Sequence, residues 1–209
     1  FTAEPRDRQG RVVIVDRPGA VQSEIRIGQV GVPRSTPHYF PLQIFNSVLG
    51  GAFTSRLMLN LREEHGFTYG IRSRFAFRRQ SGPFQMCTAV ATEVTAPAIR
   101  EATEELRGLV GDGPTPEEVT QSRDFISGVF PLRLETTGQV AGRIGELLVY
   151  ELPADFFSTY RDQIRAVTPE MAKSAGQAVM RPLELQVVVV GDAEKVRDPL
   201  ADLGLGPVE

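Results

Sequence analysis

The sequence predicts an α+β fold, in which an antiparallel or mixed sheet of about five or six strands packs helices on one face. Two strand-like segments are followed by two helical segments, two more strand-like segments, several helices and a final strand. The connections between the early segments are too short for the crossovers of a wholly parallel sheet. The chain shows no linker and no sharp change in composition, so we expect residues 1–209 to form a single domain.

The first half of the chain supplies most of the predicted sheet. Apolar and polar residues alternate in its strand-like segments, as in strands with one buried face. Residues 1–9 are polar, and we expect them to be a frayed lead-in. The expected elements are a strand over 11–16, a strand over 23–32, a helix from Pro37 or His38 to Leu49, a helix that begins at Thr54 or Ser55, a strand from Tyr69 and a strand over 84–92.

The second half is mainly helical. Thr115-Pro116 and Thr168-Pro169 are typical helix starts, because a hydroxyl can cap the first turn and proline fits its first position. Pro131 is expected to disturb the helix that runs toward it. The expected elements are helices over 98–110, 115–130, 136–150 and 155–166, a helix that begins at Thr168, an apolar strand over 183–190 and a loose tail from Asp198.

The stretch from Gly50 to Gly70 predicts a helix, a tight corner and a strand. Leu57 and Leu61 are four residues apart and therefore share one face of a helix. Gly66 supplies the left-handed residue with which many helices end. Arg62, on the last turn, and Tyr69, at the expected start of the strand, can then project from the same corner.

This stretch also resembles a known signature. The residues concerned are, in order, Gly50-Gly51, Ser55-Arg56-Leu57, Leu61-Arg62-Glu63, Gly66 and Tyr69-Gly70. This ordered set resembles the signature of the C-terminal half-domain of insulinase/pitrilysin-type zinc metallopeptidases, the group that includes the mitochondrial processing peptidases. The order of the surrounding elements is similar too, so the resemblance covers nearly the whole chain. It implies that Arg62 and Tyr69 reach across to a peptide bound at the zinc of another half.

The resemblance implies a substrate-binding, non-zinc half of a zinc endopeptidase that acts on unfolded peptides. Zn²⁺ is then expected in a partner, either an N-terminal half of the same polypeptide or a homologous subunit, and a homodimer is possible. Some relatives in this family are inactive scaffold subunits of respiratory complexes, which is the alternative function. The chain begins at Phe1, so we expect a fragment or a processed product.

The residues themselves argue against a metal site in this chain. Leu61-Arg62-Glu63-Glu64-His65 is one residue away from the inverted zinc motif H-x-x-E-H, but a leucine stands where the first ligand is needed. The only other histidine is His38, far away in the sequence. We therefore expect no metal here, and His65 is interpreted as a last-turn residue that favours the helix dipole.

Arg62 and Tyr69 also have a plainer interpretation. Arg62 could pair with Glu63 or Glu64 in solvent, a contact of little value, and Tyr69 could cover the core with its ring. The resemblance favours the functional interpretation. A permanent guanidinium and a neutral hydroxyl could together hold a peptide carbonyl and the oxyanion that develops from it.

Composition excludes other classes of function. The net charge of −3 does not favour nucleic acid, so Arg72, Arg74, Arg78 and Arg79 are interpreted as a solvated face. No apolar run approaches the roughly 20 residues of a membrane span. The single cysteine, Cys87, is expected to be a buried structural thiol. We expect a soluble protein of the bacterial cytoplasm or periplasm, although the sequence does not decide the compartment.

Overall fold

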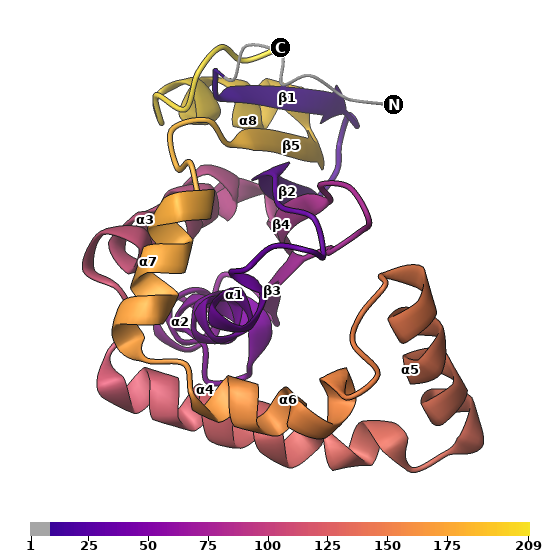
Figure 1. Cartoon of the computed structure of the whole chain (residues 1–209). Helices are drawn as coiled ribbons and strands as arrows, with labels where there is room; N and C mark the ends of the chain where they lie inside the picture. Colours follow the sequence, from indigo (N-terminus) through magenta and orange to yellow (C-terminus); the bar gives the residue numbers. More distant parts are fainter. Residues whose placement is uncertain (1–8) are drawn as a thin grey trace.

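The fold was obtained as a computed structural model that describes residues 9–209 (Figure 1). Its sheet has five strands in the order β1-β5-β2-β4-β3. β1 runs parallel to β5 and the other neighbouring strands are antiparallel, so the sheet is mixed, as predicted. The strands are β1 Arg11–Asp16, β2 Gln22–Val30, β3 Ile71–Phe75, β4 Pro83–Ala91 and β5 Gln186–Gly191.

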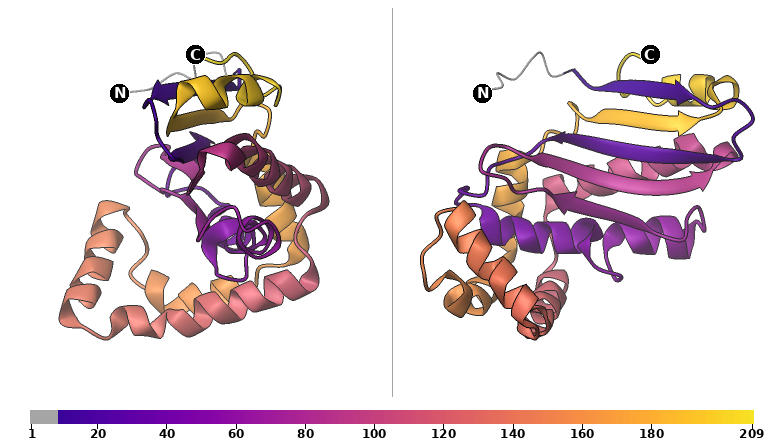
Figure 2. Two further views of the ribbon diagram at one scale, coloured as in Figure 1. Left: turned by 180° about the vertical axis from the view of Figure 1, so that it is seen from behind. Right: turned by 90° about the vertical axis from the view of Figure 1, so that its right-hand side faces the viewer.

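The helices cover one face of this sheet, which confirms the predicted fold class. Figure 1 shows α3, α7 and α8 on one side of the strands, and the right-hand view of Figure 2 shows the uncovered face. The helical segments are α1 Tyr39–Asn46, η1 Ser47–Gly51, α2 Arg56–Met58, η2 Leu59–Glu64, η3 Thr92–Val94, α3 Thr95–Asp112, α4 Pro116–Val129, η4 Pro131–Leu134, α5 Thr137–Val149, α6 Phe156–Arg165, α7 Pro169–Val179 and α8 Ala193–Ala201.

The main core lies between the sheet and these helices. Strand side chains such as Ile27, Phe84 and Val187 point toward the helices and are almost completely buried, as are Ile99 and Leu106 of α3. Their neighbours along the strands point the other way, which gives the alternation expected of strands with one buried face. A second, smaller cluster joins α1, α4, α6 and α7 around Ile44, Val119, Phe130, Tyr160, Ile164, Val167 and Ala172.

α1 and α7 approach one another closely at a single glycine. A Cβ added to Gly176 in α7 would lie 2.4 Å from Cε2 of Phe45 in α1. The Phe45 ring is itself fully buried. Glycine is therefore required at position 176 because the aromatic ring occupies the space of its side chain.

The C-terminal part of the chain differs from the prediction. The tail predicted to be loose from Asp198 includes the end of α8, whose Val196 and Leu200 are buried. Beyond α8, the backbone N–H groups of Val12 and Ile14 donate to the carbonyls of Pro207 and Glu209, at 2.9 and 2.8 Å. The sequence signal was weak because α8 is short and contains Pro199.

Both outer strands of the sheet are covered. The C-terminal residues lie along β1, as described above, and the helical segments α1 to α2 lie along β3 (Figure 2). The amide N–H of Ile71 in β3 points to the sulfur of Met58, 3.4 Å away, and the hydroxyl of Ser73 donates to Oδ1 of Asn46 at 2.9 Å. The strand begins at Ile71 and not at Tyr69, because residues 68–70 form a turn of their own.

Candidate functional site

The helix that carries Arg62 changes from α to π geometry along its length. α2 spans Arg56–Met58 and continues as the π-helical segment η2, Leu59–Glu64. Leu57 and Leu61 are fully buried, so the predicted apolar stripe is confirmed. Ser55 occupies the predicted capping position, but its hydroxyl makes no capping hydrogen bond. π-helical turns inside helices occur frequently at functional sites.

The helix ends at a sharp turn, as the position of Gly66 predicts. Gly66 has a φ of +64°, in the left-handed region. The N–H of Phe67 donates to the carbonyl of Leu61 at 2.8 Å, and that of His65 donates to Asn60 at 3.0 Å. These bonds satisfy carbonyls at the helix end and turn the chain back toward β3.

Two polar side chains attach this helix to its neighbours. The guanidinium of Arg56 donates to both carboxylate oxygens of Glu118 in α4, at 2.7 and 2.8 Å, and to the carbonyl of Gly113 at 3.2 Å. The amide of Asn60 donates to Glu101 and Glu105 of α3, at 3.2 and 2.9 Å. The position of Arg62 therefore depends on contacts with two other helices, which the local sequence pattern did not reveal.

The Arg56–Glu118 pair changes the pKa of both groups. Burial raises the pKa of Glu118, but hydrogen bonds from Arg56 and from the Thr115 backbone outweigh it, so the pKa lies below the ordinary 4.5. The hydrogen bond to Glu118 raises the pKa of Arg56. Because the folded-state pKa of Glu118 is lowered, its contribution to stability is present above the unfolded pKa and is lost as pH falls through the folded pKa.

Glu118→Gln is therefore expected to lower the free energy of unfolding at pH 7 by about 1–3 kcal/mol, the usual range for a hydrogen bond to a charged group. The difference between the two proteins should shrink as the pH falls below 4.5, because the Glu118 carboxylate of the unfolded wild-type chain then takes up a proton while the folded chain still holds it ionised. Urea unfolding at pH 7 and at pH 3 measures both effects. Glu151→Gln is the control, since its pair with Arg79 is exposed and should contribute little. A difference in the free energy of unfolding between wild type and Glu118→Gln that does not change with pH would contradict a stabilising role of the ionised Glu118 carboxylate.

Arg62 lies on the last turn of η2, at the surface. Its side chain is 34% exposed, and its Nε lies 3.4 Å from Oε1 of Glu63, so the predicted contact with a neighbouring glutamate exists. The guanidinium carbon also lies 4.7 Å from the centre of the Phe53 ring. This cation–π contact holds the charge near the surface without neutralising it. The sequence analysis assigned no role to Phe53.

Tyr69 is 97% exposed and makes no hydrogen bond or ring contact with residues 9–209. The plainer interpretation, in which its ring covers the core, is therefore wrong. The turn that presents it is nevertheless well held. The hydroxyl of Thr68 accepts from the N–H of Gly70 at 3.1 Å, donates to the carbonyl of Ala89 at 2.9 Å and contacts the hydroxyl of Thr88 at 3.0 Å. An exposed tyrosine thus projects from a turn that is fixed to β4.

His65 has a structural environment. Its ring stacks on Phe67 with 4.9 Å between centroids, and its Nε2 lies 3.7 Å from Oε2 of Glu101. Leu61, in the first ligand position of the incomplete zinc motif, is a core residue. Within residues 9–209, no group of three or more His, Cys, Asp or Glu side chains is arranged to hold a metal ion.

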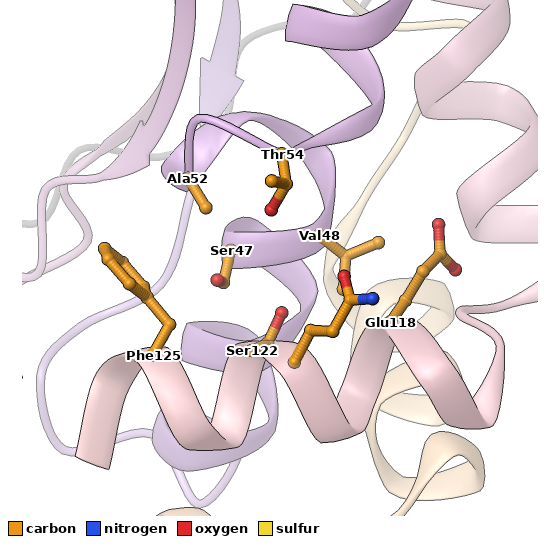
Figure 3. Close-up of a pocket in the computed structure, with 8 residues that line it drawn as sticks. Ser47, Val48, Ala52, Thr54, Glu118, Ser122 and Phe125 are labelled. Carbon is orange, nitrogen blue, oxygen red and sulfur yellow. The ribbon is translucent and has the colours of Figure 1, made fainter. Parts of the chain in front are cut away.

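A small polar pocket lies between η1 and α4 (Figure 3). The hydroxyls of Ser47 and Ser122 face it from the two sides. Ser47 is buried, and its oxygen has no hydrogen-bond partner among the described residues. The pocket includes neither Arg62 nor Tyr69, so it is separate from the predicted corner.

The uncovered face of the sheet carries a wider, open hollow bordered by β2, β4 and β5. Three residues are neighbours in register on this face: Arg26 of β2, Cys87 of β4 and Arg72 of β3.

Cys87 is half-buried, so the prediction of a buried thiol is wrong. Alternation along β4 turns it away from the core because Met86 and Thr88 point inward. Arg72 and Arg74 are exposed, as predicted.

Comparisons with known proteins agree with this fold. The family described as "Peptidase M16 inactive domain" matches residues 1–125. An uncharacterised zinc protease of Streptomyces coelicolor is 25% identical over 184 residues, which cover 84% of this chain and 40% of that protein. A protein of Helicobacter pylori described as a non-peptidase homolog is 26% identical over 71% of this chain and 34% of its own length.

A crystal structure of a peptidase M16 inactive domain from Pseudomonas fluorescens has a similar fold, with a TM-score of 0.82 and 24% identity over 88% of this chain and 44% of that one. The chain thus spans less than half the length of these relatives. Among residues 9–209, no helix is long and apolar enough to cross a membrane. Because the family match covers more than half of the sequence and the fold agrees with it, the chain belongs to the peptidase M16 family and corresponds to its inactive domain.

Proposed function

We propose that this chain is the substrate-side half of a two-part zinc endopeptidase that acts on unfolded peptides. In this proposal, the whole chain forms one half, and the Zn²⁺ is bound by a second half, in the same polypeptide or in a separate subunit. Arg62 and Tyr69 complete the active site of that zinc-bearing half. The zinc-protease names of several relatives support the presence of a metal in the partner.

The observation that carries the proposal is the presentation of Tyr69. A tyrosine that contributes to folding usually buries its ring, but this ring is 97% exposed on a turn held by Thr68. The fold gains nothing from an aromatic ring at this position. A fixed, exposed hydroxyl close in sequence to a surface guanidinium is suited to contact another molecule.

The chemical role follows from the charges. When water attacks a peptide carbonyl, negative charge develops on the carbonyl oxygen, and positioned donors lower the energy of that state. Arg62 supplies a permanent cation with several N–H donors, and Tyr69 supplies a neutral O–H donor. The metal of the partner half would supply the attacking water. Neither residue is proposed as nucleophile or base.

The test is reconstitution. The zinc-bearing half is identified by the motif H-x-x-E-H in the same or a neighbouring coding sequence, and the two halves are purified separately. We expect the mixture to cleave an unfolded, fluorescently labelled peptide, whereas neither half does so alone. A chelator should abolish cleavage and added Zn²⁺ should restore it. Full activity of the zinc-bearing half alone would contradict the proposal, as would an inactive mixture.

A scaffold function is the second candidate. The specific observation in its favour is the similarity to the Helicobacter pylori protein described as a non-peptidase homolog. A scaffold subunit would form the complex with its partner, but the mixture would cleave no peptide, and substitution of Arg62 or Tyr69 would change nothing measurable. The reconstitution assay therefore separates the two functions directly.

A further inference from the structure

The helix α5 leaves an apolar stripe exposed to solvent, while Arg143, Glu146 and Leu147 are half-buried on its inner side. On its inner side, Arg143 forms an ion pair with Glu146 at 2.7 Å, and its guanidinium lies 5.7 Å from the ring of Phe157 in α6. On its outer side, three aliphatic side chains recur every four residues, which places them in one stripe. These are Val140, Ile144 and Leu148, which are 40%, 54% and 76% exposed.

This helix gains little stability from the described part of the chain. None of its residues is buried. It also contains Gly138, Gly142 and Gly145, and each glycine inside a helix costs about 1 kcal/mol relative to alanine. Figure 1 shows α5 standing apart from the other helices. An amphipathic helix in this orientation is expected to form fully only when another apolar surface covers its outer stripe.

The C-terminal end of α5 lies near the end of β3 that is opposite to the Arg62–Tyr69 corner. β3 leads from that corner toward the end of α5, where the hydroxyl of Tyr150 donates to the carbonyl of Phe77 at 3.3 Å and Arg79 pairs with Glu151 at 2.6 Å. The right-hand view of Figure 2 shows α5 near the end of β3. A protein bound to the stripe can therefore leave the corner open to a peptide.

We propose that the stripe of Val140, Ile144 and Leu148 docks against an uncharged, apolar surface of the zinc-bearing half. This inference rests on the proposed function and specifies which surface joins the two halves. The argument for this occupant is chain length, since the Streptomyces coelicolor and Pseudomonas fluorescens proteins each have more than half of their length outside the region matched here. The three stripe residues carry no charge, which is typical of the centre of a stable interface.

The test compares two leucines of similar exposure. Leu148 is 76% exposed on α5, and Leu183 is 81% exposed in the turn before β5, so glutamate at either position should leave the isolated chain folded. We expect Leu148→Glu to raise the Kd for the zinc-bearing half by about tenfold to hundredfold, the effect of losing one buried leucine. Leu183→Glu should have no effect. Isothermal titration calorimetry measures Kd, and circular dichroism confirms folding.

Hydrogen exchange gives a second readout. The amides of α5 should exchange rapidly in the isolated chain and be protected when the zinc-bearing half is added. An active complex in which α5 stays unprotected and Leu148→Glu binds normally would overturn this inference and leave the proposed function intact. If the α5 amides are protected in the isolated chain and lose this protection on dilution, a second copy of the chain covers the stripe. That result would also overturn this inference. If the wild-type halves do not bind one another and their mixture does not cleave the peptide, the proposed function itself fails.

Discussion

Tyr69→Phe is expected to lower kcat of the reconstituted peptidase by about 10²–10³, the usual cost of losing one donor to a developing oxyanion. Arg62→Ala should have an effect of at least similar size, because it removes a charge as well as its donors. KM should change less than kcat if the contacts form mainly in the transition state. Initial rates over a range of peptide concentrations separate the two constants.

The same variants should leave the fold intact. Tyr69 is almost completely exposed, so its substitution should change the free energy of unfolding by less than about 0.5 kcal/mol. Arg72→Ala and Tyr150→Phe serve as controls, because they change the same residue types outside the corner. If the two proposed donors act on one oxygen, the double variant should lose less activity than the product of the single effects. Unchanged kcat in both single variants would remove the basis for the active-site assignment.

Gly176→Ala is expected to lower the free energy of unfolding by about 1–3 kcal/mol, the usual cost of overpacking a core. The added Cβ would lie 2.4 Å from the ring of Phe45, which is fully buried. The gain in helix propensity, about 0.5–1 kcal/mol, is too small to compensate. Urea denaturation monitored by circular dichroism measures the change.

Gly128→Ala is the matched control for this substitution. Gly128 lies in α4, where a Cβ would meet nothing within 4 Å, so alanine should stabilise the protein by about 0.5–1 kcal/mol. The double variant Gly176→Ala/Phe45→Leu should recover part of the loss, because the smaller side chain frees space. Equal effects of alanine at positions 128 and 176 would show that the helices α1 and α7 can move apart at little cost.

Local signals predicted the elements of this fold well. The alternation of 23–32, the Thr-Pro helix starts and the position of Gly66 identified β2, α4, α7 and the corner, because each depends on residues close in sequence. α8 was missed because its apolar residues are few and Pro199 interrupts the pattern. The parallel pairing of β1 with β5 joins residues about 175 positions apart, and no local pattern predicts it.

The candidate site was predicted only in part. The sequence placed Arg62 on the last turn of a helix, which the structure confirms, and Tyr69 at the start of a strand, which in fact begins two residues later at Ile71. The contacts that hold them were not predicted. Phe53 under the guanidinium and the Thr68 hydroxyl bonded to β4 are tertiary contacts of ordinary residue types. The π geometry of η2 also lacked a sequence signal, because its apolar spacing resembles that of an α-helix.

The covered edges of the sheet have a consequence for peptide recognition. A peptide can extend a sheet as a further strand only if the outer strand offers free N–H and C=O groups. Here the Met58 sulfur faces an outward amide of β3, and residues 207–209 lie along β1. In the proposed peptidase, a peptide that reaches the Arg62–Tyr69 corner would therefore meet side chains, and strand addition would be left to the zinc-bearing half. Discrimination between peptides by this half would then depend on charge and hydrogen-bonding groups near the cleaved bond more than on the ability of a peptide to form a strand.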